Sequence, residues 1–150
     1  MSEEQRRFGM MRCYTKDISF EMPKAPQIFR KDFHPELKMN INTNATKLDE
    51  NVYESSVEVT IEAKLKDSSE VAFIVEIEQA GLFQVEGFDE QQLSHLLGVA
   101  CPINLFPYLR QAVDSQLQLG SLPPLLLQPI DFESIWRKSQ ENNQNNQNNS

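Results

Sequence analysis

Hydrophobic and polar residues alternate along most of the first 80 residues of the chain. The clearest alternation runs from Val57 to Leu65, where every second side chain is apolar and each one between is polar. A period of two is typical of a half-buried β-strand. Residues 71–78 keep an apolar side chain at every second position after the turn sequence KDSS, which predicts an antiparallel hairpin. Shorter alternating stretches at 13–21 and 37–42 predict two further strands.

The apolar spacing changes to that of helices after Gly87. Asp89 is a predicted N-cap for a helical pattern that Pro102 interrupts. A second helical stretch begins at that proline and ends at Gly120, and Asp131 is placed to cap a short third helix. Four antiparallel strands with one apolar face need a covering layer. We therefore predict an α+β fold, a four-stranded antiparallel sheet with the C-terminal helices packed on one face.

The chain has the length of one domain, with two atypical ends. Residues 1–12 are predicted to be a flexible N-terminus, and residues 13–139 to form the domain. Residues 140–150 are rich in Asn and Gln and contain no apolar side chain. They cannot bury anything, so we predict a disordered tail.

The charge of the chain limits its partners. Its 14 Lys and Arg against 22 Asp and Glu give a net charge of −8. Such a surface repels nucleic-acid phosphates and anionic membranes and favours a basic partner. The sequence contains no apolar run of the roughly 18 residues that a membrane helix needs, and its start lacks the apolar run of a signal peptide. We expect a cytoplasmic protein with no nucleic-acid binding and no direct membrane insertion.

Catalytic motifs are absent from the sequence. It has no glycine-rich phosphate loop, no GxSxG and no HExxH. Cys13 and Cys101 lack the spacing of a zinc or redox site, and neither His34 nor His95 has a second ligand nearby in sequence. His95 with Cys101 is the one conceivable base and nucleophile, but six helical residues separate them by about 9 Å. We predict a non-enzyme without cofactor or metal, and leave a small Cys-dependent enzyme as an alternative.

The first predicted strand, CYTKDISFE, has a polar and an apolar side. Alternation places Asp17 and Glu21 on one face with Thr15, and Ile18 and Phe20 on the other, with Tyr14 and Lys16 before them. The two carboxylates would lie about 13 Å apart, too far to act on one bond, where about 5–9.5 Å is needed. They are more typical of a docking surface. Ile74 and Glu76 share a face of another strand in the same way.

Three segments outside the regular elements are unusually apolar: QIFRKDFHP, QAGLFQVEGF and SLPPLLLQPI. Each can fold over the sheet as core cover. A domain of this size has a large surface relative to its volume, so we expect part of this apolar surface to be exposed or to lie in an oligomer. Exposed apolar patches mark binding sites, which leaves self-association, binding of apolar clients, or both.

The segments YTKDISFEMPKAP, VYESSVEVTIEAKL, FIVEIEQAGLF, CPINLFPYLR and LPPLLLQPIDF, in this order, resemble the SecB protein-export chaperones of Gram-negative bacteria. The resemblance covers about Cys13 to Trp136. It implies a cytosolic, ATP-independent holdase that binds unfolded precursor proteins before export and passes them to the ATPase SecA. It also implies a homotetramer built as a dimer of dimers, with the first strand and first long helix, and so Cys13 and His95, at subunit interfaces.

The resemblance also implies two sets of site residues. The first would dock SecA: Asp17, Glu21, Ile74 and Glu76. The second would line an apolar groove for clients: Phe33, Met39, Ile41, Leu82, Phe83 and Phe106.

Two features leave alternatives open. The family's C-terminal tail usually carries charges that can touch SecA, whereas this tail ends in uncharged NNQNNQNNS. Related chaperones hold the antitoxin of toxin–antitoxin systems, so such a client is an alternative to precursors for export. A purely structural oligomeric subunit is a third hypothesis, which would not delay the refolding of a foreign protein.

Overall fold

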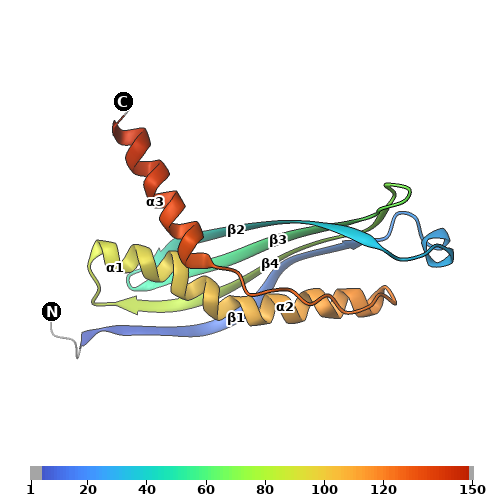
Figure 1. Cartoon of the computed structure of the whole chain (residues 1–150). Coiled ribbons are helices and arrows are strands. Elements are labelled where there is room, and N and C mark those ends of the chain that lie inside the picture. The colour runs from blue at the N-terminus through green and yellow to red at the C-terminus, as the bar shows by residue number, and fades with distance from the viewer. Residues whose placement is uncertain (1–4, 149–150) are drawn as a thin grey trace.

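A single antiparallel sheet forms the body of the molecule (Figure 1). The computed structural model describes residues 5–148. Its strands are β1 (Arg7–Glu21), β2 (Pro35–Asp49), β3 (Val52–Leu65) and β4 (Val71–Glu86), in the order β1-β4-β3-β2 across the sheet. A 3₁₀ turn, η2 (Gln27–Arg30), lies between the two edge strands in sequence. The predicted hairpin and the α+β fold are confirmed.

The helices follow the last strand. Residues 90–119 lie along one face of the sheet, and the last helix leaves the sheet at an angle (Figure 1). They are α1 (Glu90–His95), the π-helical turn η3 (Leu96–Ala100), α2 (Cys101–Leu119) and α3 (Phe132–Asn148). Asp89 caps α1 as predicted, because its carboxylate accepts the Gln92 N–H and the Gln92 side chain accepts the Asp89 N–H.

Pro102 does not interrupt the helical path, contrary to the prediction. It has no N–H for the Gly98 carbonyl, and the chain widens to a π turn instead, in which the Cys101 N–H donates to the Leu96 carbonyl. Residues 90–119 therefore run as one helical segment with Pro102 near the start of α2.

The core lies between α2 and the two central strands. Alternate residues of β3 and β4 point to α2. Each turn of α2 buries at least one side chain against them. The buried residues of α2 are Cys101, Pro102, Leu105, Phe106, Leu109, Val113 and Leu117.

Both ends of the fold differ from the sequence prediction. Strand β1 begins at Arg7, within the segment predicted to be flexible, because it pairs with the end of β4 and Phe8 stacks on Phe83 at 5.9 Å. Helix α3 continues to Asn148, through residues predicted to be disordered. Once its first turns are formed, each added residue gains an intrahelical hydrogen bond without burying a side chain. Residues 1–4 and 149–150 lie outside the described residues.

Two β-bulges in β1 change which side chains share a face. One lies between Thr15 and Asp17, which pair with consecutive residues of β4. Thr15 is thereby turned to the helix side, where its hydroxyl donates to Gln79 at 2.8 Å. Tyr14 and Lys16, predicted to lie with Ile18, lie on the opposite face instead.

None of the helices within residues 5–148 combines the length and the apolar character needed to cross a bilayer.

Candidate functional site

The face of the sheet opposite α2, which we call the open face, brings the four predicted docking residues together. Ser19 lies opposite Glu76, and Glu21 lies opposite Ile74, so the two strand segments are direct neighbours. Asp17 is on the same side of β1 as Glu21, as predicted. The carboxylates of Asp17, Glu21 and Glu76 are exposed and Ile74 is half-buried. The open face therefore presents three acidic groups around one apolar side chain.

Three carboxylates, those of Asp17, Glu78 and Glu58, form a row across neighbouring strands of the open face. Glu78 lies directly opposite Asp17 on one side and Glu58 on the other. Like charges in directly opposite positions destabilise a sheet. Within residues 5–146 none of these three carboxylates forms an ion pair. The arrangement costs stability and concentrates negative charge where a basic partner could bind.

At the end of the open face that holds Glu54, neighbouring side chains neutralise the negative charge. Glu54 accepts hydrogen bonds from Lys16 at 2.8 Å and from the Tyr14 hydroxyl at 2.5 Å. Lys16 and then Tyr14 lower the pKa of the Glu54 carboxyl, while burial, together with Glu54, raises the pKa of Tyr14 to about 12. Glu54 is thus held as a paired carboxylate, and the unpaired charge lies around Asp17.

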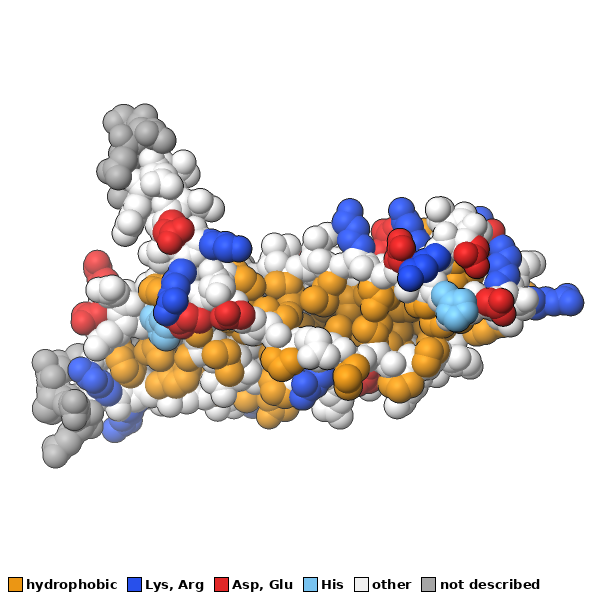
Figure 2. Space-filling view, in the orientation of Figure 1, with side chains coloured by type: hydrophobic (Ala, Val, Ile, Leu, Met, Phe, Trp, Pro, Cys, Tyr) orange, Lys and Arg blue, Asp and Glu red, His pale blue; other side chains and the backbone are white. Residues whose placement is uncertain are grey.

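An apolar strip lies on the helix side of the sheet, along the edge strand β2. Leu37, Met39 and Ile41 of β2 point to the helix side, opposite buried residues of β3. Leu37 is nevertheless 47% exposed and Met39 44%, because α2 covers β3 and β4 and leaves the edge strand open. Phe33, just before β2, is half-buried against the core. Figure 2 shows hydrophobic side chains gathered on this face between α2 and β2.

Three of the six predicted groove residues lie elsewhere. Phe83 is fully buried and Phe106 is 7% exposed, so both belong to the core. Leu82 pairs with Arg12 and Glu54, which places it on the open face. Adjacent residues of a strand point to opposite faces, so the sequence alone could have excluded a groove containing both Leu82 and Phe83. Leu37 was missed, although it alternates in phase with Met39.

The conceivable nucleophile and base do not form a pair. Cys101 is fully buried, and burial raises the pKa of its thiol to about 12, so it stays protonated near neutral pH. The Nε2 atom of His95 instead lies 2.7 Å from a carboxylate oxygen of Glu133 in α3. Among residues 5–148 no group of three His, Cys, Asp or Glu side chains could hold a metal ion.

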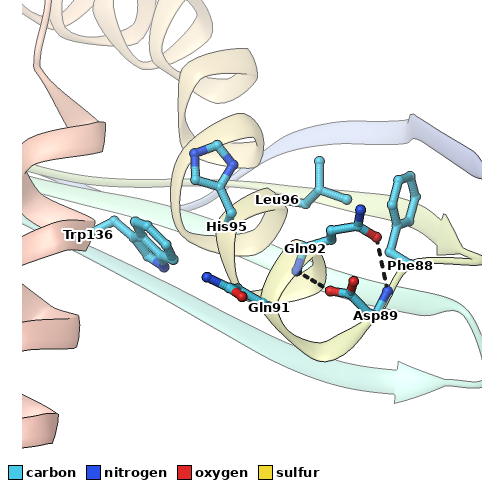
Figure 3. A pocket seen from close by; sticks show the side chains of 7 residues that line it. All are labelled: Phe88, Asp89, Gln91, Gln92, His95, Leu96 and Trp136. Carbon is cyan, nitrogen blue, oxygen red and sulfur yellow. Dashed lines mark hydrogen bonds between the residues drawn. The ribbon is translucent and has the colours of Figure 1, made fainter.

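His95 borders a hollow at the N-terminal end of the helical segment (Figure 3). Its ring meets Trp136 edge-on, with 5.0 Å between the ring centroids. Phe88 and Leu96 line the same hollow together with the capping residues Asp89 and Gln92. These side chains join α3 to α1 and include no cysteine, serine or threonine that could act as a nucleophile.

Comparison with known proteins gives consistent matches. The family model described as preprotein translocase subunit SecB matches residues 1–143. Proteins named "Protein-export protein SecB" are similar throughout. The one from Chromohalobacter salexigens is 41% identical over 140 residues (93% of this chain, 85% of that one). The one from Hydrogenovibrio crunogenus is 44% identical over 138 residues (91% of each chain), and that from Legionella pneumophila 43% over 141 residues (94% and 86%).

A solved structure shares the fold. It is the SecB-like chaperone Rv1957 of Mycobacterium tuberculosis in complex with a peptide from the HigA1 antitoxin. It matches with a TM-score of 0.67 over 83% of this chain and 91% of that one, at 16% sequence identity. At this identity the match supports the architecture alone.

Proposed function

Because the chain belongs to the SecB family of protein-export chaperones, we propose that it is an ATP-independent holdase that keeps precursor proteins unfolded and delivers them to SecA. The observation that carries the proposal is the separation of two surfaces on opposite faces of one sheet. The apolar strip of Leu37, Met39 and Ile41 would hold the client, and the open face would dock SecA.

The apolar strip suits unfolded clients of many sequences. Fully burying one Leu or Phe side chain contributes roughly 1.5–3 kcal/mol, so a few client side chains give useful affinity without sequence specificity. Folded proteins hide these side chains. A chaperone that binds only the unfolded state delays folding by mass action and needs no ATP for it.

The open face suits a basic docking partner. Asp17, Glu21 and Glu76 surround Ile74, so charge would speed the encounter and the apolar side chain would add contact area. We expect the affinity for SecA to fall as the salt concentration rises. The separation lets SecA bind while a client still occupies the strip.

We further propose a cytoplasmic homotetramer, a dimer of dimers. Helix α2 supports this because its outer side exposes Ile103 (53%), Tyr108 (44%) and Leu119 (78%). The unpaired edge of β1 is a second candidate contact. Each additional subunit would extend the apolar surface available to one long client.

The relatives favour precursor proteins over an antitoxin as clients. The relatives named for protein export are 41–44% identical to the chain, whereas the antitoxin-binding SecB-like chaperone is 16% identical. The export function is also supported by the acidic character of the open face, which carries Asp17, Glu21 and Glu76.

The test is the refolding of a denatured precursor protein with and without a stoichiometric amount of the chain and no ATP. It is repeated with Asp17→Asn plus Glu76→Gln, and with Asp67→Asn plus Glu141→Gln as a control of equal charge change at exposed sites away from the open face. We expect all three proteins to slow refolding, and only the first double variant to lose SecA binding. Unchanged refolding with the wild-type chain would reject the holdase function.

A further inference from the structure

Strand β1 shifts its register near its middle, and this shift decides to which face Asp17 points. Thr15 pairs with Gln79, and Asp17 pairs with the preceding residue of β4, Glu78, so Lys16 is the extra residue of a β-bulge. Without an extra residue, alternation would place Thr15 and Asp17 on one face. The bulge instead leaves Thr15 on the helix side, hydrogen-bonded to Gln79, and turns Asp17 to the open face. The docking surface therefore depends on where this bulge lies.

The ring contacts of β1 do not fix the position of the bulge. Phe8 stacks on Phe83 near the start of the strand, and Phe20 meets Phe73 near its end, with 6.3 Å between the ring centroids. Phe8 and Phe20 lie an even number of positions apart, so they would share the helix side with no bulge or with two. The strand has two, the second after Thr15. Because β1 is an edge strand with a neighbour on one side only, contacts near the bulge must hold it in place.

Tyr14, Lys16 and Glu54 make such a contact, and we call these three side chains the clasp. Tyr14, just before the bulge, and Lys16, within it, both donate to the Glu54 carboxylate, at 2.5 and 2.8 Å. Glu54 belongs to β3, so both side chains reach across β4. Tyr14 lies opposite Ala80 of β4, whose small side chain leaves room for the phenol ring and is fully buried although it lies on the open face. The clasp thus joins the bulge to the centre of the sheet.

A bulge two residues further along would remove Asp17 from the open face. If Ile18 were the extra residue, Asp17 would pair with Ile77 and point to the helix side. We propose that the clasp positions Asp17 for the docking of SecA, because it holds Lys16 outside the pairs of β1 and β4. The inference rests on the proposed docking of SecA to the open face. Tyr14 and Lys16 act through Asp17 and need not touch SecA.

Lys16→Gln is the deciding variant, since charge and position predict opposite effects. The substitution removes a positive charge from an acidic face, so charge alone would strengthen the binding of a basic partner. Loss of the clasp would instead reduce the fraction of molecules that present Asp17, and we expect the Kd for SecA to rise at least about threefold. Lys16→Arg keeps the charge and the donor and should retain most of the affinity.

Lys38→Gln is the matched control for charge. Lys38 is an exposed lysine on the same face, opposite Glu62, and lies outside the clasp. We expect its loss to leave the Kd for SecA unchanged or to lower it.

Tyr14→Phe removes one hydrogen bond of the clasp without a change of charge, and it guards against a folding defect of Lys16→Gln. We expect weaker SecA binding here too. The ratio of the variant Kd to the wild-type Kd should persist at high salt, where the effects of charge alone are screened. Cross-strand contacts between Asp17 and Glu78, measured by NMR, report the register directly and should weaken in both variants of the clasp.

Tighter or unchanged SecA binding by Lys16→Gln would overturn the inference and leave SecA docking standing. Weaker binding with unchanged contacts between Asp17 and Glu78 would overturn it as well, because Lys16 would then touch SecA itself. If Asp17→Asn plus Glu76→Gln binds SecA like the wild type, the proposed docking surface fails and the inference fails with it.

Discussion

On the side of the sheet that faces α2, Val59, Ile61 and Ile77 are at most 1% exposed, whereas on the open face Glu58, next to Val59 in sequence, is exposed. The same alternating strands build both faces. The difference is that α2 covers one of them. On the covered side, apolar side chains pack between strand and helix. On the open side, Asp17, Glu78 and Glu58 lie side by side, and none of them has an ion-pair partner within residues 5–146.

A second difference lies within the helix side itself. Met39 lies opposite Ile61 in the sheet, yet Met39 is 44% exposed and Ile61 is 1% exposed. Helix α2 contacts β1, β3 and β4 and leaves most of the edge strand β2 uncovered. Equivalent apolar positions thus serve as core in one strand and as accessible surface in its neighbour. The position of the covering helix decides which role each takes.

The largest expected effect is on the covered side. Leu109 is fully buried in α2, and Leu109→Ala should lower the free energy of unfolding by about 2–5 kcal/mol. Gln118→Ala, an exposed position of the same helix, should change it by less than about 0.5 kcal/mol. Urea unfolding measures both. Equal effects would remove the distinction between the two sides of α2.

The accessible strip should affect binding rather than stability. Leu37→Ser plus Met39→Ser removes two half-exposed apolar side chains, so we expect the Kd for an unfolded client to rise about tenfold, a loss of about 1.4 kcal/mol. Titration with carboxymethylated ribonuclease A gives the Kd. Asn40→Ser plus Asn42→Ser, on the open side of the same strand, is the control. A similar loss in the control would place client binding outside the strip.

The contribution of Glu54 to the stability of the protein should depend on pH. The pKa of Glu54 is lowered in the folded protein by Lys16 and Tyr14, so its contribution to stability is present above the ordinary glutamate value near 4.5 and is lost as the pH falls through the folded value. Wild type should therefore exceed Glu54→Gln by about 1 kcal/mol at pH 7 and by less at pH 3, below the ordinary glutamate value. Urea unfolding at both pH values checks this, and a constant difference would contradict the assigned pairing.

The smallest expected effect is the change in stability when the row of Asp17, Glu78 and Glu58 loses one charge. Glu58→Gln relieves repulsion from Glu78, so stability should rise by about 0.2–1 kcal/mol, with a smaller gain in high salt. Glu62→Gln, which removes an ion pair with Lys64 at 3.4 Å, should not stabilise the protein. Thermal unfolding at two salt concentrations compares the variants. A lower stability of Glu58→Gln would mean that Glu58 makes favourable interactions that outweigh its repulsion from Glu78.

The sequence predicted the elements with strong periodicity and missed those set by distant contacts. The alternation up to Leu65 and the leucine spacing of α2 each have a single interpretation, and both are confirmed. The bulge after Thr15 inserts one residue, which no composition rule detects, so Tyr14 was placed on the wrong face. The start of β1 at Arg7 depends on pairing with β4, which a local pattern does not contain.

Among the residues of the candidate sites, too, some could be placed from the sequence and others could not. Strand periodicity placed Asp17 with Glu21, and Ile74 with Glu76, on one face of their strands, and the family resemblance supplied their role. The burial of Phe106 could not be predicted, because it depends on where α3 packs. The fit of Trp136 over Gly98 joins residues 38 positions apart, and neither residue carries a signal of it in the sequence.

The most direct test of the account is whether the two faces act independently. SecA affinity is measured by titration of the chain alone and of the chain saturated with carboxymethylated ribonuclease A. The account predicts that the two values agree within about twofold, since the docking residues lie on the face opposite the strip. A client that abolishes SecA binding would contradict it, because client and SecA would then compete for one surface.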